Sequence, residues 1–117
     1  MAMTPEAKVK KVVVKHLKQM EAYYFFPATG GYGKSGVPDI VGCYKGKFFG
    51  IECKAGKNTA TALQLKNLSD ISLAGGVAVI INETNMDSTP SIISGGDWYQ
   101  EQRLNDGEVA ETWQTDH

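Results

Sequence analysis

The chain has 117 residues, 42% of them apolar and 21% charged, with a net charge of −1, and these values are ordinary for one globular domain. No apolar run approaches the roughly 18 residues of a membrane span, and the lysine-rich start lacks a signal-peptide core, so we expect an intracellular protein with no part in a membrane. The two cysteines, Cys43 and Cys53, are too few for a disulfide framework or, with the distant His16 and His117, for a zinc site, and we expect both to be small buried side chains.

The first predicted element is a helix over residues 5–21. Thr4 suits the cap position, and Pro5 suits the first helical position. The apolar residues that recur at helical spacing are Val9, Val13, Leu17 and Met20. Glu6 projects from nearly the same side as this stripe, so it either points into a site or serves only as a partner of the helix dipole.

Three strands are predicted after the first helix. An aromatic run at residues 23–26 predicts the first strand. The glycine-rich stretch at 29–36 predicts a loop, which lacks the spacing and the following helix of a nucleotide-binding P-loop. Two further strand-like runs, at 39–44 and 47–54, are separated by Lys45-Gly46, which predicts a hairpin with a two-residue turn.

A second helix and a fourth strand are predicted next. The helix covers residues 62–74 and ends at Gly75-Gly76. Its predicted apolar stripe consists of Leu65, Leu68 and Ile71. Residues 77–81 form a continuous apolar run, which is typical of a strand buried on both faces.

These elements predict an α/β fold in the order α-β-β-β-α-β. We expect one domain over residues 1–117, with a core at about 5–82 and a C-terminal extension at 83–117. In the extension, residues 90–96 are predicted as a loop in which Ile92-Ile93 forms a short strand. A helical turn is expected at 98–104, followed by a polar, acidic end.

Charge is distributed unevenly along the chain. Residues 1–66 hold eleven Lys or Arg against four Asp or Glu, a net charge of +7, whereas residues 67–117 hold one Arg against nine Asp or Glu, a net charge of −8. Such asymmetry indicates a basic working face and an acidic flank. Two ordinary solvated surfaces are the alternative.

The predicted hairpin brings three charged side chains together. A two-residue turn at Lys45-Gly46 puts Asp39 opposite Glu52, and directly opposed residues share a face of the sheet. Lys54 lies on the same face as Glu52, because strand side chains alternate with a period of two. A slip of one residue in the register would separate Asp39 from Glu52.

This cluster has a chemical interpretation. Two converging carboxylates repel each other, and an oxygen-preferring cation such as Mg²⁺ or Mn²⁺ offsets their charge. Such a metal lowers the pKa of a bound water and stabilises a phosphoryl transition state, while a lysine can orient or help deprotonate that water. The combination suits hydrolysis of a phosphodiester. The alternative, a surface cluster of weak ion pairs, is less favoured because Glu52 follows the apolar run Phe48–Ile51.

Two motifs in this region resemble those of a known group of enzymes. Gly36-Val37-Pro38-Asp39 followed by Glu52-Cys53-Lys54 is similar to the Pro-Asp…Glu-x-Lys signature of the restriction-endonuclease-like nucleases. The closer resemblance is to the VRR-NUC family, through the Gly-Val-Pro-Asp form, Gln64 ten residues after Lys54, Gly75-Gly76 before a valine-rich strand, and Glu6. It covers about residues 5–82. It implies a restriction-endonuclease-like core, in which helices flank a mixed β-sheet.

The resemblance also implies roles for individual residues. Asp39 and Glu52 would bind Mg²⁺ or Mn²⁺, with the main-chain carbonyl of Cys53 as a further ligand. Lys54 would act on the attacking water. Glu6 would support the metal through a bound water.

The resemblance gives Gln64 a catalytic role at the edge of the site. Residues Thr61 to Gln64 also have the sequence of a capping box, in which Gln64 would bond the Thr61 backbone. Both roles can hold, because a capped helix start can border a site.

Contacts with DNA are expected from residues that flank the site in sequence. These are Tyr32, Lys34, Ser35, Lys57 and Lys66, which could engage phosphates. The lysines of the first helix could do the same, but a solvated helix face accounts for them more simply.

The sequence therefore predicts a metal-dependent DNA endonuclease. Small members of the resembled family are similar to Holliday-junction resolvases, which cut branched DNA as homodimers, so we expect branched or duplex DNA as substrate and a homodimer. A noncatalytic nucleic-acid-binding module on the same fold is the first alternative. A small interaction protein of phage or mobile-element type is the second.

Overall fold

In a computed structural model, residues 3–28 and 34–95 are described. The helices are α1 (Pro5–Gln19), α2 (Ala62–Leu73) and α3 (Thr89–Gly95), with a 3₁₀ turn η1 (Met86–Ser88) before α3. The strands are β1 (Tyr23–Phe25), β2 (Ile40–Tyr44), β3 (Lys47–Cys53) and β4 (Val77–Ile81). None of the helices in this described part is long and apolar enough to cross a membrane.

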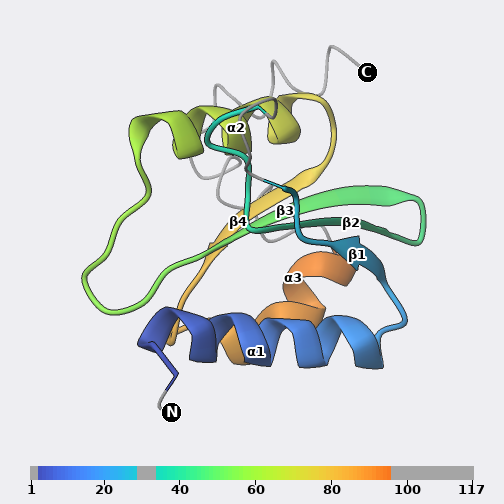
Figure 1. The fold of residues 1–117 in the computed structure, drawn as a ribbon. Helices are drawn as coiled ribbons and strands as arrows, with labels where there is room; N and C mark the ends of the chain where they lie inside the picture. Colours follow the sequence, from blue (N-terminus) through green and yellow to red (C-terminus); the bar gives the residue numbers. More distant parts are fainter. Residues whose placement is uncertain (1–2, 29–33, 96–117) are drawn as a thin grey trace.

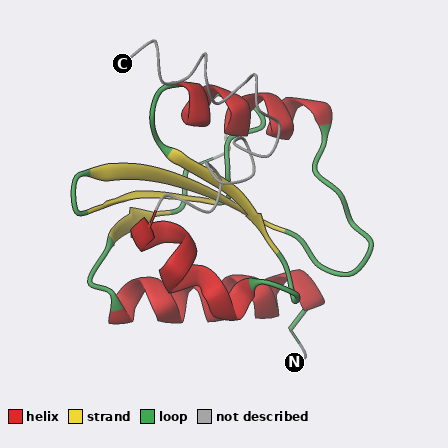
Figure 2. Cartoon of the chain, turned by 180° about the vertical axis from the view of Figure 1, so that it is seen from behind, coloured by secondary structure: helices red, strands yellow, loops and turns green. Residues whose placement is uncertain are grey.

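The four strands form one mixed sheet in the order β1-β2-β3-β4. β1, β2 and β3 are antiparallel neighbours, and β4 runs parallel to β3 after the crossover through α2. Figure 1 shows α2 on one face of the sheet and α1 with α3 on the other, and the view from behind in Figure 2 shows the same three layers. The predicted α/β fold, a mixed sheet flanked by helices, is therefore confirmed.

The hairpin between β2 and β3 has the predicted register. Lys45 and Gly46 both have positive φ, 49° and 84°, as the central residues of a type I′ turn require. Ile40 is consequently paired with Ile51 along the ladder. Asp39 immediately precedes the first paired residue of β2, so it lies at the level of Glu52.

Helix α1 supplies one wall of the hydrophobic core. The Thr4 hydroxyl accepts a hydrogen bond from the Ala7 N–H at 3.1 Å, so the helix starts at the predicted cap. The predicted stripe residues Val9, Val13 and Leu17 are buried against the sheet. Cys53 lies in this core as expected, while Cys43 is partly buried, and both thiols are free.

The predicted loop at residues 90–96, with a short strand at Ile92-Ile93, is wrong. Residues 89–95 form α3, in which Ile92 and Ile93 are buried in the same core as the α1 stripe. Pro90 fits the first helical turn, where its missing N–H costs little. The packing of these two isoleucines against α1 stabilises the helix. The core therefore extends beyond residue 82, the predicted limit. The predicted helical turn at 98–104 lies outside the described residues.

Helix α2 buries Leu68 of the predicted stripe and half-buries Ile71, but it leaves Leu65 at the surface. Its buried residues are Asn67, Leu68 and Ser72, whereas Leu65 is 50% exposed. The close approach of the sheet explains part of this arrangement, because a Cβ on Gly50 would lie 2.6 Å from Ile71 Cδ1. The absence of a side chain at Gly50 therefore lets α2 pack close to the middle of β3.

Candidate active site

Asp39 and Glu52 meet where β2 begins and β3 ends. The Asp39 N–H donates to Glu52 Oε1 at 3.2 Å, and the Cys53 N–H donates to Asp39 Oδ2 at 2.9 Å. These two hydrogen bonds tie each carboxylate to the backbone of the opposite strand. The predicted meeting of Asp39 with Glu52 is confirmed, and the backbone of Cys53 belongs to the same small region.

Glu52 is a buried acid with one unsatisfied oxygen. The residue is 1% exposed, and its Oε2 has no hydrogen-bond partner. The Lys54 ammonium lies 3.7 Å from this oxygen, which is an ion-pair distance but too long for a hydrogen bond. Leaving a buried carboxylate oxygen unpaired is costly, so the arrangement does not serve stability.

Burial raises the pKa of Glu52 to about 7, and the nearby Asp39 charge acts in the same direction. The Lys54 ammonium opposes this shift but does not overcome it. A second cation close to Glu52 would favour its charged form further. The Glu52 carboxyl is therefore a group whose ionisation depends on what binds beside it.

Cys53 has no nucleophilic character in this position. Burial raises the pKa of its thiol to about 12, and the charges of Asp39 and Glu52 add to the effect. A thiol that stays protonated is a poor nucleophile and a poor metal ligand. Only the backbone of Cys53 is suited to a role in the site.

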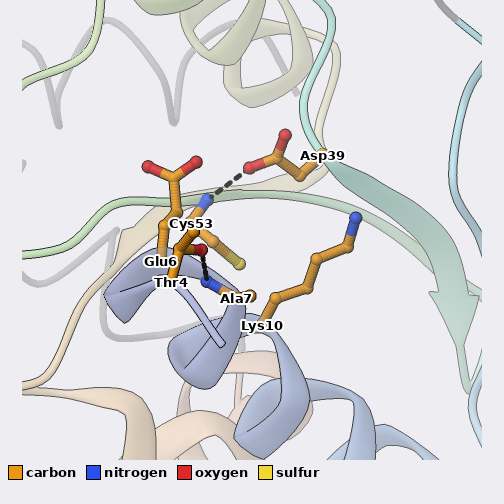
Figure 3. A pocket seen from close by; sticks show the side chains of 6 residues that line it. All are labelled: Thr4, Glu6, Ala7, Lys10, Asp39 and Cys53. Carbon is orange, nitrogen blue, oxygen red and sulfur yellow. Dashed lines mark hydrogen bonds between the residues drawn. The ribbon is translucent and has the colours of Figure 1, made fainter. Parts of the chain in front are cut away.

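A pocket of about 220 Å³ lies between Asp39 and the start of α1. It is lined by Thr4, Glu6, Ala7, Lys10, Asp39 and Cys53. Figure 3 shows the Glu6 and Lys10 side chains rising from α1 toward the strand end that carries Asp39. Of the two interpretations of Glu6, the one in which it points into a site agrees with this position.

One feature of the acidic residues suits a hard cation, namely the unsatisfied oxygen of Glu52. Across residues 3–28 and 34–95, no group of three or more His, Cys, Asp or Glu side chains is placed to hold a metal ion. The predicted ligand set is of another kind, with direct carboxylates from Asp39 and Glu52, a carbonyl oxygen, and Glu6 through water. The unsatisfied Glu52 Oε2 is an oxygen that a cation would satisfy, and oxygen ligands suit Mg²⁺ or Mn²⁺.

Gln64 forms the capping box of α2. Its side-chain oxygen accepts from the Thr61 N–H at 2.9 Å, and its own N–H donates to the Thr61 hydroxyl at 3.2 Å. The capping interpretation is confirmed. The side-chain oxygen of Gln64 is therefore engaged, and its role in catalysis stays a prediction.

The residues predicted to contact DNA lie at the surface. Lys34, Ser35 and Lys57 are exposed. Lys66 is exposed as well and forms an ion pair with Asp70 at 3.0 Å. None of these four residues lines the pocket beside Asp39. Tyr32 lies outside the described residues.

Two residues that sequence reasoning missed hold the loops on either side of the site. Asn67 is buried and donates to the carbonyls of Ser35, at 3.1 Å, and Leu63, at 2.9 Å, which fastens the segment before Asp39 to α2. Glu83 accepts from the Gly56 N–H at 2.9 Å, which fastens the segment after Lys54 to the end of β4. No local pattern marks either contact.

Lys10 is a third residue that sequence reasoning placed elsewhere. The sequence favours a solvated helix face for the lysines of α1, yet Lys10 lines the pocket with Glu6 and Asp39. The available signal was its spacing, because Lys10 follows Glu6 by one helical turn and shares its side of the helix.

No protein-family model and no curated protein matches the chain. The interpretation of the site therefore depends on its geometry and on the order of its motifs.

Proposed function

We propose that this protein is a divalent-metal-dependent endonuclease that hydrolyses DNA phosphodiester bonds and is related to the VRR-NUC family. The observation that carries the proposal is the meeting of Asp39, Glu52 and Lys54 at the ends of two neighbouring strands, with one Glu52 oxygen buried and unsatisfied. A stable fold gains nothing from such an acid, whereas a metal-binding site requires it.

Each residue of the cluster has a distinct task in this reaction. Asp39 and Glu52 would hold Mg²⁺ or Mn²⁺, and the Cys53 N–H keeps the Asp39 carboxylate in place. The bound ion would supply the Lewis acidity and the positive charge that phosphodiester hydrolysis needs. Lys54, whose side chain is 14% exposed, would orient the attacking water with its ammonium group. Water adds across one P–O bond, which leaves a phosphate monoester and a free hydroxyl.

The charge distribution supports a phosphate-bearing substrate. Asp39, Glu52 and Lys54 all belong to the first 66 residues, whose net charge is +7. A positive field attracts the DNA backbone and speeds association. The exposed Lys34, Ser35, Lys57 and Lys66 would contact phosphates around the site, with Tyr32 as a further predicted contact.

A branched substrate and a homodimer complete the proposal. Both come from the resemblance to small nucleases that cut four-way junctions. A symmetric junction presents two equivalent strands, and two copies of one chain related by a twofold axis match them.

The test is a cleavage panel of single-stranded, duplex, flap and four-way-junction DNA with Mg²⁺ or Mn²⁺. We expect cleavage of at least one substrate, its loss when the metal is chelated, and paired symmetric cuts on the junction. Full activity of Asp39→Asn would rule out the proposed mechanism. DNA binding without cleavage across the panel would instead favour the noncatalytic module, and neither DNA nor Mn²⁺ binding would favour the interaction protein.

A further inference from the structure

Two lysines approach the acidic residues from opposite faces of the sheet. Cys53 packs into the core that α1 covers, so its neighbour Lys54 projects toward the other face. Lys10 belongs to α1 and lines the pocket with Asp39 and Glu6. The proposed function assigns a task to Lys54 but leaves Lys10 without one.

Lys10 is held in place by an aromatic ring. Its ammonium nitrogen lies 4.3 Å from the centroid of the Phe26 ring, which is a cation–π distance. Phe26 in turn meets Tyr24 edge to face, with ring centroids 6.0 Å apart. Phe26 is 49% exposed and Lys10 is half-buried, so the ring orients the Lys10 charge while part of the side chain stays in contact with solvent.

The Lys10 charge is available to a ligand. Within the described ranges, the ion pairs formed by lysines are Lys54 with Glu52 and Lys66 with Asp70. Contact with a ring leaves the N–H groups of an ammonium free to donate to an anion. Lys10 therefore differs from Lys66, whose charge is already engaged on its own helix.

We infer that Lys10 is a phosphate-binding residue of this site, positioned by Phe26. This inference rests on the proposed nuclease function. A DNA phosphate that approaches Asp39 and Glu6 is repelled by both, and the ammonium of Lys10, which lines the same pocket, offsets that repulsion on the α1 face. Lys10 donates to a non-bridging phosphate oxygen, and Phe26 acts as a positioning residue through Lys10.

The test compares Lys10→Met with Lys11→Met. Lys11 is an exposed lysine on the same helix and does not line the pocket, so the two variants lose the same charge and keep a similar side-chain length. Binding of duplex DNA is measured over a salt series with Ca²⁺, a hard cation with the same oxygen preference. One lost phosphate contact lowers the slope of log K against log salt by about 0.9. We expect this loss in Lys10→Met, none in Lys11→Met, and restoration in Lys10→Arg.

Phe26→Leu tests the positioning role. We expect it to weaken DNA binding in the wild-type background and to add nothing in the Lys10→Met background, because both substitutions remove one interaction. Equal effects of Phe26→Leu in both backgrounds would overturn the role assigned to the ring.

Further measurements separate this inference from the nuclease proposal. Calorimetric Mn²⁺ binding is expected to be unchanged in Lys10→Met, since Lys10 is not a ligand. If the wild type cleaves DNA and Lys10→Met matches Lys11→Met in salt slope and in kcat/KM, the inference is overturned and the nuclease stands. If no DNA is cleaved but the slope changes only in Lys10→Met, the nuclease proposal fails and the phosphate site stands.

Discussion

The two ends of the β2–β3 hairpin differ in how far their charged side chains are exposed to solvent. At the turn, the Lys45 ammonium is exposed and lies 5.5 Å from the centroid of the Tyr44 ring, in contact with solvent. At the other end, Glu52 is 1% exposed, and its Oε2 lacks a hydrogen-bond partner. The same two strands therefore carry a solvated charge at one end and a costly one at the other. Only the second end calls for a ligand to explain it.

The largest expected difference between these ends is in activity. Asp39→Asn removes a proposed metal ligand, and Lys54→Met removes the group that orients the water, so we expect kcat/KM for DNA cleavage to fall about 1,000-fold or more. Lys47→Met, near the turn, removes a charge from the same hairpin and serves as the control. An equal loss in Lys47→Met would mean that general charge, and not the site, governs cleavage.

A smaller effect is expected in the pH dependence of stability without divalent metal. Because the pKa of Glu52 is raised from 4.5 to about 7 in the folded protein, the folded state holds a proton that the unfolded chain has released between these values. Stability from this group is thus present below pH 4.5 and is lost as pH rises through about 7, by roughly 3 kcal/mol. Glu52→Gln removes this loss.

Urea denaturation of the wild type and Glu52→Gln at pH 5, 6, 7 and 8 measures the effect. The difference between the two proteins isolates the contribution of Glu52 from that of the other titrating groups. A difference that does not change with pH would show that Glu52 has an ordinary pKa in the fold.

Divalent metal is expected to reverse this behaviour. Mn²⁺ at 100 times its Kd stabilises a protein that binds it only when folded by about 2.7 kcal/mol. The gain is larger above pH 7 than at pH 5, because the metal binds the ionised carboxylate. Thermal denaturation with and without Mn²⁺ checks it, and we expect the gain in Lys47→Met but not in Glu52→Gln. Stabilisation that survives in Glu52→Gln would place the metal elsewhere.

The smallest effect is expected at the turn. Gly46 has a φ of 84°, so Gly46→Ala strains the hairpin by about 1 kcal/mol. Its free energy of unfolding, from urea titration, is expected to fall by this amount while kcat for DNA cleavage is unchanged. A fall in kcat would show that the turn transmits strain along the strands to Asp39.

Interactions between residues close together in the sequence could be predicted, and interactions between residues far apart in the sequence could not. The turn chemistry of Lys45-Gly46 is local, and it sets the register that brings Asp39 to Glu52. The capping box of Thr61 and Gln64 is local too. Each of these arrangements follows from a few neighbouring residues, which is why the meeting of Asp39 with Glu52 and the capping of α2 were predicted correctly.

The rest depended on contacts between distant segments. Ile92 and Ile93 lie in a helix because they pack into the core beside α1. No apolar periodicity at residues 90–96 predicts this helix. Asn67 is buried because it meets the Ser35 carbonyl, 32 residues away in sequence. Side-chain spacing places Lys10 on the side of Glu6, but only packing of α1 against the sheet puts that side beside Asp39.

The sequence by itself determined the pairing of β2 with β3 and the meeting of two acids at the end of their hairpin, because turn type and strand periodicity act over short windows. Only the tertiary structure decided that Glu52 would be buried with one oxygen unsatisfied, and that Lys10 would face the same pocket as Asp39. Burial and charge proximity are properties of packed layers, and they arise when α1 and α2 close on the two faces of the sheet.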